Sequence, residues 1–408
     1  MIIYNYPTSF NEPIVGGAIK NPFYLSQMLK KRGMDITVIT YKPNKDKKDK
    51  EIEVFNGIKV HIIGQTILKG VFRSLILSFN EAKELLMLLK REDFDIIHTH
   101  TFSIMGLAIL RRLKKISIPI LSTAHGTSLP ETIANLEKRS FYSILAKIDA
   151  YIEYYIDQYS WLNFDKVISA GYYQVREMID IYKLPKEKVI PIPNGVDISF
   201  YKPDPKAGNK IKEKYEIENK RIVLFVGRLV KKKGLQYLIN SAPLIIRKVP
   251  DTVFLIVGGT DKFAQYESEL KKLIKHLNLE EKFIIVKNVP EKDMPSYYNA
   301  ADVCVVPSIN YEPLPTVVFE AMACGKPVVA SNLGGIPEQL GYDYTLVPPK
   351  NSKELAKKII EILQNDDLYI TLSKRNRKRA REFDWVEIAK KHIKIYKELI
   401  NQGSIIER

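Results

Sequence analysis

Cysteine and long apolar runs are both scarce in this sequence of 408 residues. Its two cysteines, Cys304 and Cys324, each lie inside an apolar segment, which argues against a disulfide framework and favours a reducing compartment. No apolar stretch approaches the ~20 residues that a membrane-spanning helix needs. The opening residues MIIYNYPTSF lack a basic region followed by an apolar run, so we expect no cleaved secretory signal and a cytoplasmic protein.

Acidic residues are outnumbered, with 47 Asp and Glu against 63 Lys and Arg, which gives a formal charge of +16. This excess fits a nucleic acid, an anionic membrane surface or phosphorylated substrates as partners, and it equally fits a lysine-rich surface that only aids solubility. A basic nucleic-acid-binding protein is the alternative from another functional class. Because the sequence lacks a helix-turn-helix, zinc-finger or RNP-type aromatic motif, we expect no nucleic acid partner.

Short apolar runs that read as strands alternate with helical stretches along the whole chain. The pattern indicates parallel sheets covered on both faces, and two series of strands indicate two doubly wound, Rossmann-like α/β domains. No G-x-G-x-x-G follows the first strand, which disfavours a dinucleotide-dependent oxidoreductase. The expected strands are residues 2–6, 35–40, 58–63, 95–99, 119–124, 166–170 and 188–192, then 221–226, 252–257, 282–286, 302–306 and 327–331.

The domain boundaries follow from composition. We expect an N-terminal domain over residues 1–195, a linker rich in proline and turn formers over 196–210, and a C-terminal domain over 211–383. Residues 384–408 have apolar positions on one helical face and are expected to form a helix that packs back on the N-terminal domain. The charge run KPNKDKKDKE (42–51) is expected to form a solvated loop.

A basic stretch, VGRLVKKKGL (226–235), directly follows an expected strand and opens an expected helix. Ligands of α/β sheets bind at such positions. The planar guanidinium of Arg228 and the mobile ammonium of Lys233 would suit a diphosphate. Lys231 and Lys232 are expected to face solvent. Basic residues after a strand are common, so this stretch alone identifies no function.

Two acids, Glu312 and Glu320, bracket the stretch EPLPTVVFE (312–320). We expect Glu312 on a loop and Glu320 in a helix that starts near Pro315 and stops at Gly325. This arrangement does not resemble the paired carboxylates of a glycosidase, which flank one bond from opposite sides. It favours acids that accept hydrogen bonds from the hydroxyls of a bound sugar.

Backbone amides at the start of the same helix are candidates for anion binding. The amides of Leu314, Thr316 and Val317 would lie at the positive end of the helix, and Pro315 would hold the loop extended. Leu314, Pro315 and Thr316 are therefore candidate ligand-binding residues.

Three histidines follow or end apolar strands. His125 could simply bond a neighbouring carbonyl, and His98 and His100 stand two positions apart, so their side chains share one face of a strand. No carboxylate partner lies near them in sequence, and we expect structural roles for both. No Asp-x-Asp occurs in a convincing metal-binding loop, so we expect no metal site and no cofactor.

Six motifs are spread along the chain: EPIVGGA (12–18), AHGT (124–127), PNGVD (193–197), VGRLVKKKG (226–234), EPLPTVVFEAMACGKPVVAS (312–331) and GGIPE (334–338). With these motifs the chain resembles the retaining glycosyltransferases of family 4, which have the two-domain GT-B fold. The resemblance covers nearly the whole length, and the E-x7-E spacing of Glu312 and Glu320 is its most specific element.

The resemblance implies two domains that face a central cleft, the first binding the acceptor and the second a nucleoside diphosphate sugar. It implies that Glu312 holds sugar hydroxyls, Glu320 holds the ribose, and Arg228 with Lys233 holds the diphosphate. In the first domain, His125 would line the sugar site. Gly16 and Gly17 would form a loop that approaches the phosphates closely.

The resemblance also implies a reaction, namely transfer of a sugar from a UDP- or GDP-linked donor to a hydroxyl acceptor by same-face displacement. The acceptor itself is not specified, and lipid-linked, polysaccharide and cell-surface glycan acceptors remain open. Ile19 stands where the family commonly has an acidic residue, which places acceptor recognition in question. A GT-B sugar-nucleotide epimerase is the nearest alternative, because it shares the architecture and the substrate.

Two segments of the first domain suggest a peripheral association with the inner face of the membrane, and a third suggests an acceptor groove. ILKGVFRSLILSF (67–79) mixes apolar bulk with basic residues, RRLKK (111–115) is a basic cluster, and residues 141–161 are rich in tyrosine. The first two could rest on anionic lipid, and the third could shape an acceptor groove. Core packing and contacts between subunits explain these segments equally well.

Overall fold

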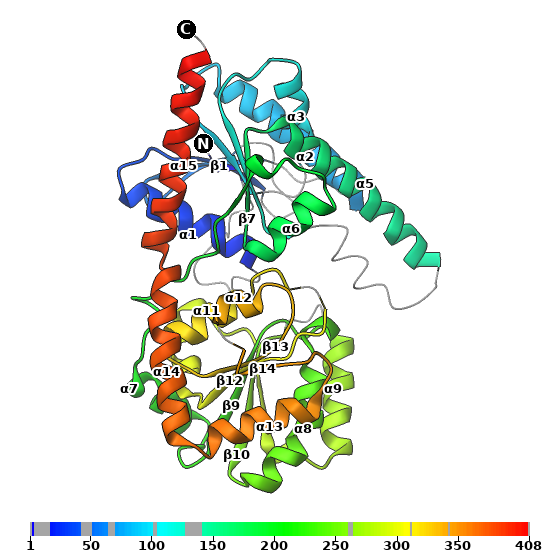
Figure 1. Cartoon of the computed structure of the whole chain (residues 1–408), viewed down its shortest axis with the longest axis vertical. Helices are drawn as coiled ribbons and strands as arrows, with labels where there is room; N and C mark the ends of the chain where they lie inside the picture. Colours follow the sequence, from blue (N-terminus) through cyan, green and yellow to red (C-terminus); the bar gives the residue numbers. More distant parts are fainter. Residues whose placement is uncertain are drawn as a thin grey trace. The chain divides into compact units, whose positions relative to one another are not determined.

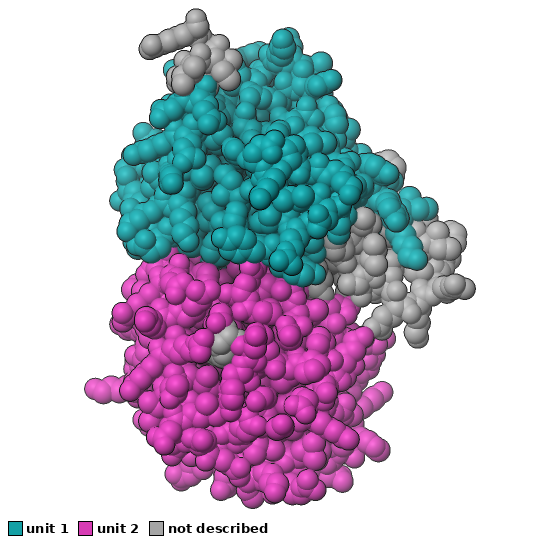
Figure 2. Space-filling view, in the orientation of Figure 1, with its two compact units in different colours: residues 1–8, 16–194, 385–408 teal, residues 9–15, 195–384 magenta. Residues whose placement is uncertain are grey.

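The chain folds into two compact units (Figure 2). The computed structural model describes residues 2–3, 17–41, 51–63, 70–100, 104–126, 141–259, 264–310, 312–341 and 343–406. Unit 1 contains the described residues up to 194 together with residues 385–406, and unit 2 contains the described residues between 195 and 384.

Unit 1 is built on a sheet that has eight strands within the described residues, in the order β3-β4-β2-β1-β5-β6-β7-β8. Neighbouring strands run parallel, except that β3 pairs antiparallel with β4. The strands are β1 (Ile2–Ile3), β2 (Thr37–Tyr41), β3 (Glu51–Phe55), β4 (Ile58–Ile63), β5 (Ile97–Thr99), β6 (Ile120–Ala124), β7 (Lys166–Ser169) and β8 (Val189–Pro191).

Helices cover both faces of this sheet (Figure 1). Apolar residues of α2, α3, α5 and α6 form one core with the strands, and those of α1 and α15 form another. Adjacent strand residues such as Val167 and Ile168 belong to different cores, as the alternation of side chains across a strand requires. The helices are α1 (Gly17–Lys31), α2 (Gly70–Leu88), α3 (Met105–Arg112), α5 (Phe141–Asn163), α6 (Tyr172–Asp180) and α15 (Trp385–Ile406).

The last helix returns to the first unit. α15 lies against α1, and its residues Trp385, Ile388 and Leu399 are buried in the core that α1 shares with the sheet (Figure 1). The ring of Trp385 stacks on that of Tyr24, with centroids 6.1 Å apart. Most of the apolar face that the sequence indicates for residues 385–400 is therefore buried, but Val386 on that face is 37% exposed.

Unit 2 contains a parallel sheet of six strands within the described residues, in the order β11-β10-β9-β12-β13-β14. The order reverses at β9 and β12, which pair through Val303 with Val223 and Cys304 with Leu224. Ligands of doubly wound sheets bind outside the carboxyl ends of the strands at such a reversal. The strands are β9 (Arg221–Val226), β10 (Thr252–Val257), β11 (Phe283–Val286), β12 (Val303–Val306), β13 (Val328–Ser331) and β14 (Leu346–Val347).

The helices of unit 2 also divide between two layers. α8, α9 and α13 share one apolar core with the strands, whereas α10 and α11 contact β9 and β13 outside this core. The helices are α7 (Pro205–Lys214), α8 (Leu235–Lys248), α9 (Ala264–His276), α10 (Met294–Ala300), α11 (Thr316–Ala323), α12 (Ile336–Leu340), α13 (Ser352–Leu363) and α14 (Asp366–Ala380).

Two regions differ from the sequence-based expectations. Residues 51–55 form an edge strand, β3, at the end of the expected charged loop, whose residues 42–50 lie outside the described part of the chain. Residues 196–210 were expected to form a linker, but they belong to unit 2, where α7 begins at Pro205. The side chain of Asp204 caps α7 by accepting a hydrogen bond from the amide of Ala207 at 3.0 Å.

Candidate functional site

The loop after β9 packs closely against the loop after β12. It runs from Gly227 through a short 3₁₀ turn, Lys231–Lys233, to Gly234, where α8 begins. Gly234 has a φ of +69°, and a Cβ at this position would overlap the backbone oxygen of Pro307. Only glycine allows both this conformation and this close approach. The pairing of β9 with β12 thus brings two distant loops together at the carboxyl end of the sheet.

Glu312 lies on the loop after β12 and contacts the loop after β9. Lys233 forms an ion pair with Oε1 of Glu312, although the two residues are 79 positions apart. The hydroxyl of Ser308 donates a hydrogen bond of 3.0 Å to the same oxygen. Glu312 is only 5% exposed, and its Oε2 atom forms no hydrogen bond with any residue in the described part of the chain. One carboxylate oxygen is therefore anchored, while the other is left for further donors.

A third loop, after β13, supports the backbone of Glu312. The amide of Gly335 donates to the carbonyl of Glu312 at 3.0 Å. Gly334 has a φ of +56°, and a Cβ here would overlap that same carbonyl oxygen. The side-chain amide of Gln339 donates to the carbonyl of Pro315 at 3.0 Å. The GGIPE motif therefore shapes the loop that carries Glu312, a role that its sequence alone did not indicate.

Helix α11 begins and ends where the sequence predicts. Pro315 is its N-terminal cap residue and makes no side-chain capping bond, and the helix ends before Gly325, whose φ is +69°. Leu314 is buried, and Thr316 is the first helical residue. The first-turn amides of α11 thus lie directly after the loop that contains Glu312.

Glu320, on α11, is 4% exposed and has a partner that the sequence did not indicate. The hydroxyl of Tyr298, on α10, donates to Oε2 of Glu320 at 2.7 Å. The ring of Tyr298 packs edge-on against that of Tyr201, with centroids 5.9 Å apart, and the hydroxyl of Tyr201 donates to Glu291 at 2.6 Å. Glu320 is thus part of a buried tyrosine–carboxylate network.

Unit 2 therefore contains seven of the predicted site residues. Lys233 and Glu312 are in direct contact, and Arg228 lies on the same loop as Lys233. Leu314, Pro315 and Thr316 lead into α11, which carries Glu320. Arg228 is exposed, and its guanidinium forms no hydrogen bond or ion pair within the described ranges. Lys231 is exposed, as expected, and pairs with Glu269 at 3.5 Å.

The other predicted residues fall in the N-terminal part of the chain. His125 belongs to unit 1, and Gly17 is the first residue of α1. Gly16 lies outside the described residues.

Four histidines of unit 1, His98, His100, His125 and His392, form a cluster in which all but the half-buried His125 are buried. The rings of His98 and His100 lie 4.1 Å apart, as expected for one face of a strand. The two ring nitrogens of His98 lie 2.7 Å from the hydroxyls of Tyr396 and Thr123, which gives this histidine a structural role. Nδ1 of His100 lies 3.0 Å from Nε2 of His125, and their rings stack.

Burial keeps these histidines neutral. Desolvation, and then the charge that His392 would carry, lower the pKa of His125 to about 4. Burial likewise lowers the pKa of His392, on α15, to about 4. The pKa values of His98 and His100 are also lowered by burial. At neutral pH each of these rings is therefore an uncharged donor and acceptor.

Acid should destabilise unit 1 through these rings. Below about pH 6.5 the unfolded chain protonates His125 and His392 while the folded chain does not, so the free energy of unfolding falls until about pH 4. We expect a loss on the order of 1 kcal/mol per pH unit for each histidine. Urea unfolding at pH 7, 6 and 5 measures this slope.

A matched pair of variants tests whether the buried histidines cause the change of the free energy of unfolding with pH. We expect His392→Gln to flatten the pH dependence, because one buried ring no longer titrates. His276→Gln, which changes an exposed histidine on α9, should leave the slope unchanged. Equal slopes in the wild type and in His392→Gln would contradict this explanation.

The described residues hold no cluster of three or more histidine, cysteine, aspartate or glutamate side chains arranged to bind a metal ion. Within the same residues, no helix is both long and apolar enough to cross a membrane.

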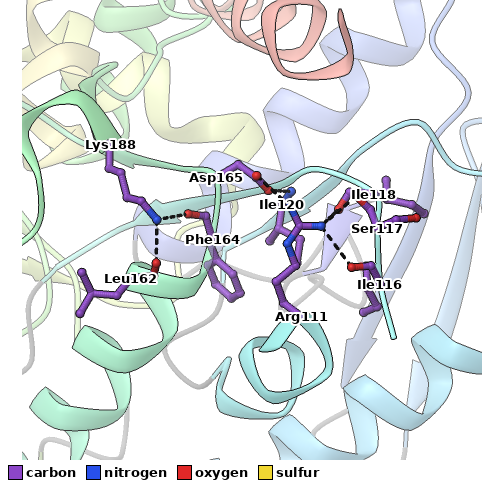
Figure 3. A network of polar contacts seen from close by, with 9 residues as sticks. All are labelled: Arg111, Ile116, Ser117, Ile118, Ile120, Leu162, Phe164, Asp165 and Lys188. Carbon is purple, nitrogen blue, oxygen red and sulfur yellow. Dashed lines mark hydrogen bonds and ion pairs between the residues drawn. The ribbon is translucent and has the colours of Figure 1, made fainter. Parts of the chain in front are cut away.

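The side chains of the basic cluster RRLKK differ in exposure. Arg111 is half-buried, and its guanidinium donates to the carbonyl of Ser117 at 2.8 Å and pairs with Asp165 at 2.9 Å (Figure 3). Arg112, Lys114 and Lys115 are exposed, and Leu113 between them is 61% exposed. The exposed part of the cluster therefore combines three cations with one apolar side chain.

Two other segments noted in the sequence also reach the surface. On α2, Ile76 and Phe79 are exposed, whereas residues 67–69 lie outside the described part. α5 is partly a core helix, because Trp161 is buried and Tyr154 donates to the carbonyl of Ile181 at 3.0 Å. Its outer face exposes Ile148, Tyr151, Ile152, Tyr155, Tyr159 and Leu162.

Comparison with known proteins shows what this arrangement is similar to. Residues 15–200 match the family model described as Glycosyltransferase Family 4, and residues 208–381 match the one described as Glycosyl transferases group 1. An uncharacterized glycosyltransferase of Methanocaldococcus jannaschii is 27% identical over 404 residues, which cover 97% of each chain.

Solved structures show the same fold. Sucrose-phosphate synthase from Thermosynechococcus elongatus matches with a TM-score of 0.81 and 23% identity, covering 98% of this chain and all of the other. HepE of Anabaena, solved in complex with UDP-glucose, matches with a TM-score of 0.75 and 21% identity, again covering 98% and 100%. The fold that these chains share is GT-B.

Proposed function

Because this chain belongs to the family 4 glycosyltransferases, we propose that it moves a sugar from a UDP- or GDP-linked donor to a hydroxyl acceptor with retention of configuration. The observation that carries this proposal is the contact of Lys233 and Ser308 with Glu312 at the carboxyl end of the unit 2 sheet. HepE was solved with UDP-glucose, which supports a nucleotide-sugar donor. The candidate acceptors are hydroxyls of lipid-linked, polysaccharide and cell-surface glycan molecules.

The donor diphosphate is assigned to the cations of the loop after β9. Arg228 is exposed at this loop, and Lys233 lies beside Glu312. The amides of Thr316 and Val317 add positive potential at the start of α11, since Pro315 supplies no capping side chain. No metal ion or cofactor is required in this scheme, because these groups neutralise the charge of the diphosphate.

The sugar and the ribose of the donor are assigned to the two acids. A carboxylate has about four acceptor positions, so Glu312 can accept from sugar hydroxyls while Lys233 and Ser308 hold its Oε1. Glu320 can likewise accept from ribose hydroxyls while it accepts from Tyr298. Acids in these positions bind hydroxyls and do not hydrolyse a glycosidic bond.

Transfer then proceeds as a same-face displacement. The bond between the sugar and the diphosphate breaks first, its electron pair stays on the diphosphate oxygen, and the sugar becomes oxocarbenium-like. The acceptor oxygen forms the new bond on the same face, and its proton passes to the departing diphosphate oxygen. Arg228, Lys233 and the α11 amides stabilise the charge that develops there. His125, neutral because of its burial, is assigned to the sugar site.

A donor panel tests this proposal. A ligand that binds only the folded state stabilises it by about 2.7 kcal/mol at 100 times its Kd. We expect thermal unfolding in the presence of UDP-, GDP- and ADP-sugars to shift upward for one base. Release of the free nucleoside diphosphate should then require an acceptor. Interconversion of the sugar without an acceptor would instead identify an epimerase, and no shift with any donor would contradict the proposal.

We also propose that unit 1 rests on an anionic membrane surface through the exposed cations at the end of α3. Arg112, Lys114 and Lys115 surround Leu113, and cations beside an exposed apolar side chain favour anionic headgroups. The half-buried Arg111 is excluded from this surface.

Liposome flotation measures this association. We expect the wild type to float with vesicles that contain anionic lipid and not with neutral vesicles, and added salt should weaken the association. The double variant Lys114→Ala/Lys115→Ala should float several-fold less. Lys206→Ala/Lys210→Ala, which removes two exposed lysines of α7, should float like the wild type. Equal flotation with both kinds of vesicle, or with neither, would remove the proposal.

A further inference from the structure

We propose that Ser308 and Tyr298 are positioning residues, each holding one of the two donor-binding acids in place from inside unit 2. Ser308 would fix Glu312 for the donor sugar, and Tyr298 would fix Glu320 for the ribose. This inference rests on the proposed function, because it concerns how the same site recognises its donor.

Ser308 sits just beyond β12 and is fully buried. Its hydroxyl donates to Oε1 of Glu312 at 3.0 Å, the oxygen that Lys233 also contacts. Lys233 is a flexible residue that the proposed function also assigns to the diphosphate. When Lys233 turns toward a bound diphosphate, Ser308 is the donor that keeps Glu312 in place. Both donors contact Oε1, so Oε2 of Glu312 can accept from a sugar hydroxyl.

Tyr298 plays the corresponding part for Glu320. It is 1% exposed on α10, and its hydroxyl donates to Oε2 of Glu320 at 2.7 Å. Burial, and then the charge of Glu320, raise the pKa of Tyr298, so its hydroxyl stays protonated and able to donate. The ring is fixed in turn by edge-on packing against Tyr201. A hydrogen bond to a carboxylate from a fixed ring restricts the carboxylate to one orientation.

The two residues act through the acids, so their removal should change donor recognition in different ways. Loss of the Ser308 hydroxyl should affect the sugar end of the donor and spare the nucleotide end. Loss of the Tyr298 hydroxyl should affect the ribose. A residue with only a structural role would lower the stability of unit 2 without separating these two effects.

The role of Ser308 is tested by calorimetry, which measures the affinity for a nucleotide sugar and for the matching nucleoside diphosphate. The probes are UDP-glucose with UDP, or GDP-mannose with GDP. We expect Ser308→Ala to weaken nucleotide-sugar binding roughly tenfold and to leave diphosphate binding unchanged. Ser308→Cys keeps a weak hydrogen-bond donor of similar size, so its affinity for the nucleotide sugar should lie between those of the wild type and Ser308→Ala. Ser241→Ala is the matched control, since Ser241 is equally buried but donates to the carbonyl of Leu238.

A double-variant cycle separates positioning from packing. If Ser308 acts through Glu312, Ser308→Ala should cause no further loss of nucleotide-sugar affinity in a Glu312→Gln background. Additive losses would overturn the role assigned to Ser308.

For Tyr298, the readout is discrimination between ribose and deoxyribose. We expect wild-type protein to bind UDP or GDP more tightly than its 2′-deoxy or 3′-deoxy form, and Tyr298→Phe to reduce that preference roughly tenfold. Tyr297→Phe is the matched control, because the neighbouring Tyr297 is also buried but its hydroxyl contacts Tyr215 at 3.1 Å.

The outcomes distinguish this inference from the proposed function. If wild-type protein binds the probes and both positioning variants keep wild-type recognition, the inference is overturned while the proposed function stands. If wild-type protein binds none of the probes, both are overturned. Loss in Ser308→Ala and Tyr298→Phe, but not in the two controls, supports the inference.

Discussion

Lys233→Ala is expected to lower the turnover of the enzyme about 100-fold, equivalent to about 3 kcal/mol of transition-state stabilisation. The ammonium of Lys233 is the cation that the structure places directly against Glu312, at the start of α8. Its removal deprives the leaving diphosphate of a stabilising positive charge. It also removes one of the two hydrogen-bond donors to the carboxylate of Glu312. Release of nucleoside diphosphate from the donor selected by thermal shift, with acceptor present, measures the effect.

Lys231→Ala provides the control for this prediction. Lys231 lies in the same short turn, but its side chain is exposed and pairs with Glu269 on the surface. An exposed pair of this kind contributes little, so turnover should stay within about twofold of the wild type. Arg228→Ala should resemble Lys233→Ala. Near-native turnover in both Arg228→Ala and Lys233→Ala would exclude a cationic clamp on the diphosphate.

Gly334→Ala is expected to destabilise unit 2 by roughly 3 kcal/mol and to reduce turnover at least tenfold. Gly334 has a φ of +56°, and the added Cβ would overlap the backbone oxygen of Glu312. Either the loop of Glu312 or the loop after β13 must therefore move, which also disturbs the bond from the amide of Gly335. Thermal unfolding and the donor assay, applied to the same preparation, measure both effects.

Gly33→Ala is the control that measures the effect of left-handed backbone strain without the steric overlap expected in Gly334→Ala. Gly33 has a φ of +83°, but a Cβ there would meet no atom within 4 Å. This variant should lose about 1 kcal/mol from the left-handed conformation alone and keep full turnover. If Gly334→Ala were no more harmful than Gly33→Ala, the close approach of the two loops would not matter for the site.

Much of unit 2 could be predicted from its sequence because each signal is local. Short apolar runs predict the buried parallel strands, and the turn residues around Pro315 and Gly325 predict both ends of α11. Since the carboxyl ends of parallel strands share one edge of a sheet, the loops that carry Lys233 and Glu312 could be expected to meet. The resemblance to a family supplied the roles, which spacing alone does not.

The parts that sequence did not reveal depend on contacts between distant segments. Tyr298, which donates to Glu320, lies on another helix. Ser308 is close to Glu312 in sequence, but nothing in the local pattern indicates that its hydroxyl donates to this acid together with Lys233. The histidine cluster joins β5, the end of β6 and the last helix, so its burial is a tertiary property. Strand β3 was missed because its alternating glutamates follow a run of lysines and resemble a continuation of the loop.

A crystal structure of the protein with its selected nucleoside diphosphate sugar would show whether the donor binds in unit 2 as proposed. We expect diphosphate oxygens within hydrogen-bond distance of Arg228 and Lys233, with sugar hydroxyls on Glu312 and ribose hydroxyls on Glu320. A donor bound away from the carboxyl ends of β9 and β12, with these four side chains touching no part of it, would exclude this mode of donor binding.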